Sequence, residues 1–323
     1  MSEVAPGLVT VFGGSGFVGS QVVQALARRG WRVRVAVRNP KRAWKLQTAG
    51  NVGQIQSFRC DATQPDQVAE ALIGADAAVN LIGILYESGK RTFHAMHVDT
   101  ARNIAEACAA GRVERLVHMS AIGASPDSES DYALSKAAAE MAVREVKPDA
   151  VIIRPSVVFG PGDDFLNRFA QMAQYAPALP LIGGGQTKFQ PVYVGDVAEA
   201  VARAATLPEA AGRTFELGGP AVMTFEDVLK LVLRETYRGN GLVPLPFFAA
   251  RAIGSAAQLS AIVGIPPVLT RDQVILLESD NVVAEGAEGL AELGIEPTGV
   301  EAIAPGYLWR YRRGGQFAEP KAA

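Results

Sequence analysis

A glycine-rich turn that follows a short apolar segment limits the fold of this chain more than any other feature. Residues 8–12 read LVTVF, and Gly13, Gly16 and Gly19 follow within the sequence GGSGFVG. Gly13 permits a tight turn, Gly16 lets the backbone approach a pyrophosphate, and Gly19 lets a helix pack closely on the strand. The helix N-terminus offers unpaired N–H groups and the positive end of its dipole. The pattern predicts a strand, a phosphate-binding turn and a helix, with an ordinary glycine-rich turn as the alternative.

Segments of strand character alternate with segments of helical spacing through the first half of the chain. Strands are predicted at residues 8–12, 32–37, 55–59, 77–82, 116–119 and 151–153, and helices at 17–29, 67–73, 100–110 and 132–146. This alternation is typical of a parallel sheet with helices on both faces, so we predict an α/β protein with a doubly wound parallel sheet of the Rossmann type. The dinucleotide-binding domain is expected over 1–159, completed by about 191–220. A smaller, mostly helical C-terminal lobe is expected over 160–190 and 221–323.

Composition and charge exclude several other classes of protein. The 323 residues include 31 Lys and Arg against 33 Asp and Glu, so the chain lacks the globally basic surface of many nucleic-acid-binding proteins. The two cysteines, Cys60 and Cys108, exclude a disulfide scaffold, fit a reducing compartment and are expected in the core. Neither they nor the three histidines have zinc-site spacing, so no metal is expected. We therefore expect neither a secretory leader nor a transmembrane helix, because Met1–Gly7 lacks the leader pattern and no apolar run is long enough to span a membrane.

The first sixty residues are strongly basic. Between Val4 and Cys60 there are nine Lys and Arg and no Asp or Glu. NAD-specific proteins of this kind carry an acid about 20 residues after the glycines, whereas here Arg38 and Asn39 occupy that place. Because Arg38 can bind a 2′-phosphate, we predict a preference of roughly tenfold or more for NADP(H) over NAD(H). For most of these cations a solvated basic face is the alternative.

Tyr132 and Lys136 form a Y-x-x-x-K pattern in the predicted helix 132–146. Residues four apart share one helix face. An ammonium group beside a phenol stabilises the phenolate, so Tyr132 is a candidate proton donor or acceptor whose pKa Lys136 lowers. Lys136 is also placed to bind the nicotinamide ribose. The spacing is common, and the alternatives are a surface tyrosine with a solvated lysine, or a pair that serves cofactor binding alone.

These motifs follow the order found in the short-chain dehydrogenases/reductases, and the chain resembles the extended or atypical branch of that family. The resemblance covers about residues 7–220 and also includes Asp61, NLIG at 80–83, RPSVVFGPG at 154–162 and QPVYVGDVA at 190–198. More narrowly, the chain is similar to the nucleotide-binding accessory subunits of respiratory complex I (NADH:ubiquinone oxidoreductase) and their bacterial relatives. That similarity is carried by VFGG at 11–14, HVD at 97–99, QPVYV at 190–194 and LTRDQV at 269–274.

The resemblance implies which residues hold the cofactor. Asp61 is expected to meet the adenine edge, and residues 81–83 to pass beneath the cofactor. The expected catalytic residues are Tyr132 and Lys136. The expected cofactor-binding set is Gly13, Gly14, Ser15, Gly16, Phe17, Val18, Arg38, Asn39, Asp61, Ala62, Leu81, Ile82, Gly83, Tyr132, Lys136, Pro155 and Val158.

The sequence departs from the family's catalytic pattern at two positions. The substrate-orienting hydroxyl is replaced by Ala121, and the helix asparagine that often relays protons is replaced by His97. Loss of such a donor lowers the rate by about 10²–10³ unless Ser120, Ser125 or His97 compensates. We therefore expect a cofactor that turns over slowly or not at all. His94 and His97 are expected to reach the mouth of the site, and His118 to be buried with its hydrogen bonds satisfied.

Three functions are compatible with these features. The first is a weakly or non-catalytic, NADP(H)-binding accessory subunit or assembly factor of respiratory complex I. The second is an NADPH-dependent reductase or isomerase of a lipophilic substrate, for example in quinone biosynthesis. The third is a redox sensor that changes partners with the state of the cofactor. Expected partners are complex I subunits or a quinone-synthesis assembly, and the expected localisation is cytoplasmic or peripheral on the cytoplasmic face of the inner membrane.

Residues 242–263 are rich in Leu, Phe, Ala and Ile. If this stretch is helical, Arg251, Ser255 and Gln258 form a narrow polar stripe on an otherwise apolar surface. Three interpretations remain open: a core helix of the lobe, a helix that docks on a partner or, through Leu245–Val263, on a membrane interface, and a lid over an apolar substrate.

Overall fold

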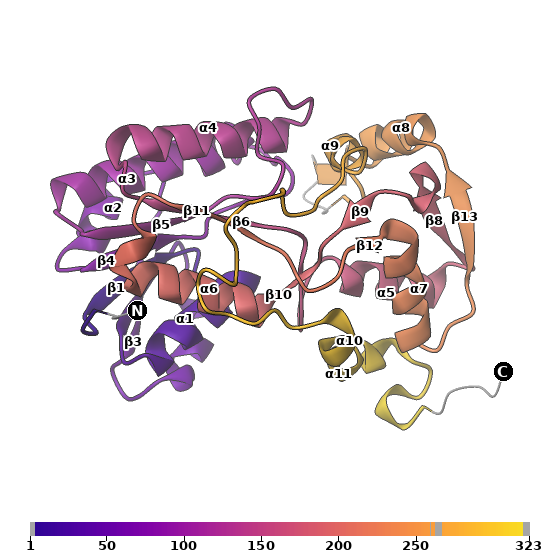
Figure 1. The fold of residues 1–323 in the computed structure, drawn as a ribbon, viewed down its shortest axis with the longest axis horizontal. Coiled ribbons are helices and arrows are strands. Elements are labelled where there is room, and N and C mark those ends of the chain that lie inside the picture. Colours follow the sequence, from indigo (N-terminus) through magenta and orange to yellow (C-terminus); the bar gives the residue numbers. More distant parts are fainter. Residues whose placement is uncertain (1–3, 259, 262–266, 319–323) are drawn as a thin grey trace. The chain divides into compact units, whose positions relative to one another are not determined.

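The structure is a computed structural model that describes residues 4–258, 260–261 and 267–318. The chain forms two compact units, whose elements are labelled in Figure 1. The first unit comprises the residues up to Pro155 together with Gly195–Leu217 and Glu285–Glu296. The second comprises Ser156–Val194, Gly218–Ala284 and the residues from Pro297 on. Each unit is therefore built from chain segments that are far apart in the sequence.

A parallel sheet forms the centre of the first unit. Within the described residues it has seven strands in the order β11-β6-β5-β4-β1-β2-β3, and every neighbouring pair is parallel. The strands are β1 (Leu8–Phe12), β2 (Arg32–Val37), β3 (Ile55–Arg59), β4 (Ala77–Asn80), β5 (Arg115–Met119), β6 (Val151–Pro155) and β11 (Thr214–Leu217). The predicted doubly wound sheet is confirmed. Its strand order reverses between β1 and β4, which is where open α/β sheets bind ligands.

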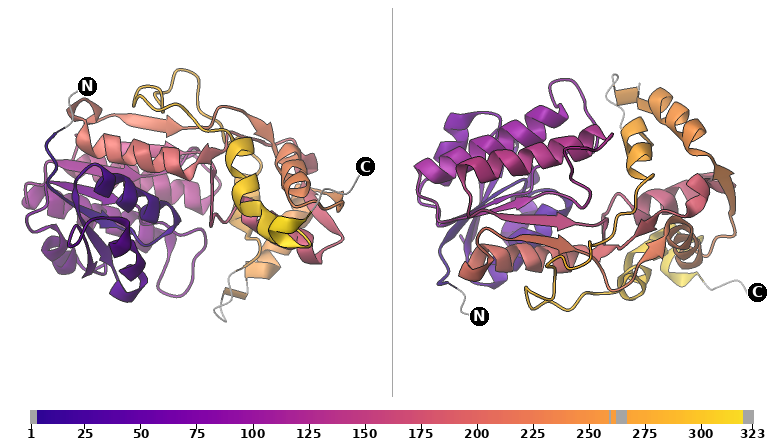
Figure 2. Two further views of the ribbon diagram at one scale, coloured as in Figure 1. Left: turned by 90° about the horizontal axis from the view of Figure 1, so that it is seen from below. Right: turned by 45° about the horizontal axis from the view of Figure 1, so that its top comes forward.

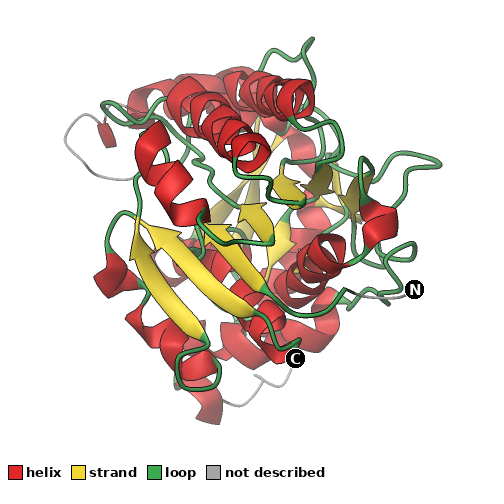
Figure 3. Ribbon diagram, turned by 90° about the vertical axis from the view of Figure 1, so that its left-hand side faces the viewer, coloured by secondary structure: helices red, strands yellow, loops and turns green. Residues whose placement is uncertain are grey.

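Helices cover both faces of this sheet (Figures 1 and 2). On one face lie α2 (Pro65–Leu72), α3 (Thr100–Ala110) and α4 (Asp131–Val146), and on the other lie α1 (Phe17–Arg28) and α6 (Val194–Thr206). Figure 3 shows the yellow strands of the sheet with red helices on both sides of it. Four shorter turns lie between these elements in the described residues: η1 (Pro40–Arg42), η2 (Trp44–Ala49), the π-helical turn η3 (His94–Asp99) and η5 (Pro208–Ala210). Covered on both sides, the central strands are buried, as their continuous apolar sequence predicts.

The core beneath α2, α3 and α4 consists mainly of small and branched side chains. Val68, Ile104 and Val143 contribute one residue from each helix, and each is fully buried. Cys60 and Cys108 lie in the same cluster as reduced thiols, which confirms the prediction that both are core residues. Burial raises the pKa of each thiol to about 12. Both side chains therefore act as small apolar groups in this core.

The second unit combines pairs of short strands with helices. The strand pairs are β8 (Ala178–Ile182) with β13 (Gly241–Leu245), β7 (Val158–Phe159) with β10 (Val192–Tyr193), and β9 (Lys188–Phe189) with β12 (Met223–Thr224). The helices are α5 (Leu166–Tyr175), α7 (Phe225–Glu235), α8 (Phe247–Gln258), α9 (Arg271–Leu276), α10 (Val300–Ile303) and α11 (Pro305–Leu308). One apolar cluster joins α5, α7 and α11 through Leu166, Val232 and Leu308. This unit is the predicted smaller, mostly helical lobe.

The apolar stretch 242–263 does not form one helix. Residues 241–245 form β13, which pairs in parallel with β8, so the stretch is a strand and not a helix there. The helix α8 begins at Phe247, and residues 259 and 262–266 lie outside the described part of the chain. The described residues contain no helix that is both long enough and apolar enough to cross a membrane.

The exposed face of α8 is apolar. Its buried residues are the small Ala250 and Gly254, whereas Phe248 is 77% exposed and Ile253 is 51% exposed. A core helix buries its large side chains, so this interpretation of α8 does not agree with the structure. The predicted polar stripe is on the helix, and its Arg251 forms an ion pair with Glu278.

Candidate functional site

The turn after β1 has the geometry that its glycines predict. Gly13 has a φ angle of +76°, and a Cβ atom there would lie 3.0 Å from the carbonyl group of Leu81. A Cβ atom at Gly19 would overlap the carbonyl oxygen of Gly13, so α1 packs directly on the turn. A Cβ atom at Gly16 would meet only that same oxygen among the described residues, at 3.3 Å. The space beside Gly16 is therefore open to a ligand.

The N-terminus of α1 is suited to an anion. Gly16 occupies the N-cap position, and within the described residues no side chain caps the helix and its first turn holds no acidic residue. The free N–H groups and the dipole at such an end favour a phosphate. This end of α1 follows β1 at the point where the strand order reverses. A dinucleotide pyrophosphate fits this arrangement.

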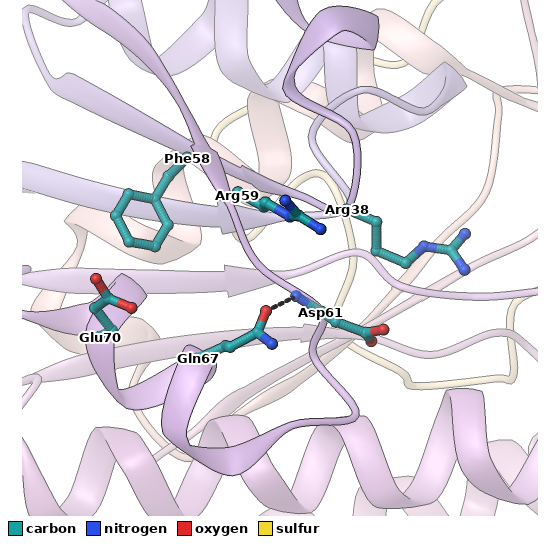
Figure 4. A pocket seen from close by; sticks show the side chains of 6 residues that line it. All are labelled: Arg38, Phe58, Arg59, Asp61, Gln67 and Glu70. Carbon is teal, nitrogen blue, oxygen red and sulfur yellow. Dashed lines mark hydrogen bonds between the residues drawn. The ribbon is translucent and has the colours of Figure 1, made fainter.

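A cavity of about 600 Å³ opens at the carboxyl ends of β2 and β3 (Figure 4). Its lining residues are Arg38, Phe58, Arg59, Asp61, Gln67 and Glu70. The backbone N–H of Asp61 donates to Gln67 Oε1 at 2.9 Å, and Oδ1 of Asp61 accepts from the N–H and the hydroxyl of Thr63 at 3.1 and 2.9 Å. These bonds fix Asp61 at the rim. Two residues of the expected cofactor set, Arg38 and Asp61, thus share one cavity.

Tyr132 and Lys136 lie one turn apart near the start of α4. Tyr132 is half-buried, and its ring meets that of His97 edge-on with a centroid separation of 5.5 Å. Phe93 also packs edge-on against it, at 5.9 Å. The Nζ atom of Lys136 lies 5.9 Å from the centroid of the Tyr132 ring. The two side chains therefore share one face of the helix, as their spacing predicts.

Lys136 is a buried cation. It is 4% exposed, and its Nζ donates to the carbonyl oxygen of Met119 at 3.1 Å. Burial lowers the pKa of the ammonium group to about 8, and the carboxylate of Glu140 one turn further along α4 opposes that shift. A Cβ atom at Gly83 would lie 3.5 Å from this Nζ. The ammonium group thus lies against the backbone that follows β4.

His97 is buried in the π-helical turn η3, so the expectation that it reaches the mouth of the site is wrong. Its Nε2 accepts from the N–H of Ile84 at 2.9 Å, which places the ring proton on Nδ1. Nδ1 lies 2.8 Å from Ser135 Oγ, and that hydroxyl donates to the carbonyl oxygen of Tyr132 at 2.7 Å. Burial, together with the nearby charge of Lys136, lowers the pKa of His97 to about 2. His97 is therefore a neutral link between the loop after β4 and α4.

Asn80 ends β4 two residues before its predicted end. Its Oδ1 accepts from the N–H of Ile82 at 3.1 Å, and its Nδ2 donates to His118 Nδ1, also at 3.1 Å. His118 Nε2 and Ser120 Oγ are buried and have no hydrogen-bond partner among the described residues. The prediction of a fully satisfied His118 is therefore wrong at one of its two nitrogens. Burial lowers the pKa of His118 to about 3, so this ring is neutral as well.

The remaining members of the expected cofactor set lie in several places. Oδ1 of Asn39 accepts from the N–H of Lys41 at 3.1 Å and so caps η1. Ala62 is buried, and its carbonyl oxygen accepts from Asn103 Nδ2 at 3.0 Å. Pro155 ends β6 in the first unit, whereas Val158 begins β7 in the second. The described residues contain no cluster of His, Cys, Asp and Glu that could hold a metal ion.

Comparison with known proteins identifies the family. The model of the NAD dependent epimerase/dehydratase family matches residues 9–218. The chain belongs to this family. Two curated relatives match almost the whole chain. The "NADH dehydrogenase (ubiquinone) 1 alpha subcomplex subunit 9, mitochondrial" of Rattus norvegicus is 36% identical, over 96% of this chain and 82% of its own. The "NADH-ubiquinone oxidoreductase 40 kDa subunit, mitochondrial" of Neurospora crassa is 30% identical, over 97% of this chain and 82% of its own.

Solved structures of this epimerase/dehydratase type share the fold. DesIV, a dTDP-glucose 4,6-dehydratase of Streptomyces venezuelae solved with NAD and TYD bound, superposes with a TM-score of 0.71. The match covers 95% of this chain and 98% of DesIV at 19% sequence identity. At that identity the likeness concerns the fold alone.

Some residues that shape this epimerase/dehydratase site are absent from the expected set. Ser135 and Ile84 hold His97, and Arg59 lines the cavity beside Arg38. Ser135 lies three residues after Tyr132 on the same helix, so helical spacing contained a signal for it. Ile84 contributes a backbone N–H, which no side-chain pattern reports.

Proposed function

We propose that this epimerase/dehydratase family member is a dinucleotide-binding accessory subunit or assembly factor of an NADH:ubiquinone oxidoreductase, with weak catalysis or none. The observation that carries the proposal is the extent of the similarity to the rat subunit, which spans 96% of this chain and so includes both units. Similarity confined to the first unit would support shared cofactor binding and no more. Cofactor that binds the folded state stabilises it by mass action, which gives the cofactor a structural role.

Two features of the first unit support weak catalysis. Position 121 is an alanine, so no hydroxyl follows Ser120 to polarise a substrate carbonyl. His97 is held by Ile84 and Ser135 with both ring nitrogens engaged, and its low pKa keeps it from carrying a proton near neutral pH. The residue that replaces the family's proton-relaying asparagine therefore has a positioning role in this proposal.

The proposed cofactor is NADP(H), in preference to NAD(H). Arg38 follows β2 directly and is exposed at the cavity, and no carboxylate occupies that strand end. A guanidinium at this place pairs with a 2′-phosphate, whereas an NAD-specific site carries an acid there. Titration with NADPH and NADH tests this preference. Equal affinities in the wild type, unchanged in Arg38→Ala, would contradict it.

A rival function is that of an NADPH-dependent reductase or isomerase of a lipophilic substrate, such as one of quinone biosynthesis. The retained Tyr132 and the buried Lys136 beside it favour this rival, because they are the proton-transfer pair of the resembled family. The Tyr132→Phe protein separates the two functions. Full cellular function of that variant supports the accessory role, whereas loss of function with normal folding and cofactor binding supports chemistry.

The exposed face of α8 is the proposed contact surface in the second unit. Phe248 and Ile253 lie exposed on it, and Arg251, the one charged residue of the helix, is paired with Glu278. An uncharged apolar face of this kind suits a protein partner or the interface of a membrane. The corresponding location is cytoplasmic, with peripheral attachment to the inner membrane as the alternative to a purely soluble protein.

Affinity capture tests the proposed function as a whole. The tagged protein is purified from its own membranes in mild detergent, and the proteins that accompany it are identified by mass spectrometry. Stoichiometric recovery of the subunits of an NADH:ubiquinone oxidoreductase supports the accessory role. Recovery of the protein alone, or with quinone-synthesis enzymes, supports the reductase.

A further inference from the structure

A second arginine opens into the cavity beside Arg38. Arg59 is the last residue of β3, and it stands in register with Val37, the residue immediately before Arg38. Arg38 and Arg59 are both exposed and both line the cavity of about 600 Å³. Figure 4 shows both side chains near the ends of these two strands. The ends of two neighbouring parallel strands thus carry two cations that line the same cavity.

Both guanidinium groups are available to a ligand. Among the residues that the structure describes, neither Arg38 nor Arg59 forms an ion pair or a side-chain hydrogen bond, whereas Arg29, Arg154 and Arg213 are all paired with carboxylates. Two unpaired arginines at neighbouring strand ends repel each other unless an anion lies between them. Their arrangement therefore favours a ligand with more than one negative charge.

The surroundings of the two arginines contain charges of both signs. Burial, followed by the charges of Arg38 and Arg42, lowers the pKa of Arg91, which lies in the loop after β4. Arg91 is therefore close enough to Arg38 and Arg42 for their charges to act on it. The cavity's carboxylates are Asp61, whose Oδ1 is bonded to Thr63, and Glu70, which lies across the cavity from Arg38 in Figure 4.

We propose that Arg59 is a specificity-determining residue that binds the 2′-phosphate of the dinucleotide together with Arg38. This inference rests on the proposed NADP(H) preference and assigns a second residue to it. A phosphate monoester carries between one and two negative charges near neutral pH and offers three acceptor oxygens, which two guanidinium groups can share. The adenosine ribose of a bound dinucleotide would lie near the end of β2, and β3 is the strand next to it.

The test is the affinity of the purified full-length protein for NADPH, NADH and 2′,5′-ADP, measured by calorimetry. Arg59→Ala is expected to weaken the binding of NADPH and of 2′,5′-ADP about tenfold and to leave NADH within twofold of the wild type. Arg59→Lys keeps the positive charge but loses the paired N–H donors of the guanidinium group. Its affinity for NADPH is expected to lie between those of the wild type and Arg59→Ala. The matched control is Arg32→Ala, which removes an exposed arginine from the opposite end of β2.

The possible outcomes separate the inference from the proposed function. If the wild type binds NADPH and NADH equally, the NADP(H) preference fails, and the role of Arg59 fails with it. If the wild type prefers NADPH and Arg59→Ala keeps that preference, Arg59 does not bind the 2′-phosphate. The proposed NADP(H) preference then stands without it. An equal loss for NADPH and NADH also overturns the inference, because it shows that Arg59 does not act on the 2′-phosphate. Thermal unfolding of each variant verifies that it is folded.

Discussion

The Nδ1 atom of His97 and the hydroxyl oxygen of Ser135 lie 2.8 Å apart, and this contact joins the loop after β4 to the helix that carries Tyr132 and Lys136. The other ring nitrogen of His97 is bonded to the N–H of Ile84. A residue that replaces a proton relay in the resembled family thus holds two parts of the site together.

His97→Leu is expected to destabilise the protein by about 2–3 kcal/mol, because it leaves the N–H of Ile84 buried without an acceptor and removes the donor to Ser135. Ser135→Ala is expected to lower the free energy of unfolding by about 1 kcal/mol. Denaturant unfolding followed by circular dichroism measures both. The matched control is His94→Ala, since the side chain of His94 is 75% exposed and its contact with Asp99 lies at the surface. Equal stabilities of the His97 and His94 variants would show that the buried contacts of His97 with Ile84 and Ser135 do not stabilise the fold.

Acid is expected to destabilise the protein through its two buried neutral histidines. The pKa values of His97 and His118 are lowered to about 2 and about 3, so below pH 6.5 the unfolded chain binds protons that the folded chain does not. Stability therefore falls as the pH falls from 6.5 towards 3, and each histidine accounts for about 2 kcal/mol at pH 5. His118→Leu removes one of these contributions, so its stability should fall less steeply with acid than that of the wild type. If the free energy of unfolding changes equally with pH in the two proteins, His118 does not contribute to the loss of stability in acid.

Lys136 is expected to make the free energy of unfolding rise as the pH rises above 8. Its pKa is lowered to about 8 in the folded protein, so above that pH the unfolded chain binds more protons than the folded one. The stability of the ligand-free wild type should therefore rise relative to Lys136→Met from pH 8 to 10, by up to about 1.4 kcal/mol per pH unit. The difference between the two proteins isolates the effect of Lys136 from that of the cysteines, whose thiols titrate in this range in the unfolded chain. A difference that is constant with pH would contradict a lowered pKa.

Gly19→Ala is expected to destabilise the protein by about 2 kcal/mol or more and to abolish dinucleotide binding. The new methyl group would overlap the carbonyl oxygen of Gly13, which belongs to the turn itself, so backbone atoms must move. Gly306→Ala is the control, because a Cβ atom there has no described atom within 4 Å and the glycine lies inside α11. That variant should be as stable as the wild type or slightly more so. Unfolding and NADPH titration of both variants make the comparison.

The sequence predicted the architecture of the first unit because two strong local signals agreed there. Glycines at fixed spacing after an apolar run determine the turn, and the alternation of strand and helix segments determines a parallel sheet. The positions of Arg38 at a strand end and of Tyr132 and Lys136 on one helix face follow from the same periodicities. Each depends on residues close together in the chain.

The features that sequence reasoning missed depend on long-range contacts or irregular periodicity. His97 lies in a π-helical turn, which contains an extra residue relative to an α-helix, so helical spacing misplaces it. The strand at 241–245 contains Pro244 and pairs with residues more than sixty positions earlier, so no local pattern indicated it. Arg59 becomes a candidate for the proposed 2′-phosphate site only because β3 lies beside β2 in the sheet.

The interleaving of the two units has a consequence for the order in which the protein folds during synthesis. The first unit is complete only when Glu285–Glu296 is present, because Glu288 pairs with Arg213 and Arg203 donates to the carbonyl oxygen of Leu293 at 2.6 Å. A ribosome has by then released most of the second unit from its exit tunnel. The first unit therefore acquires these contacts only after most of the second unit has been synthesised, and nascent chains that end before Glu285 lack them.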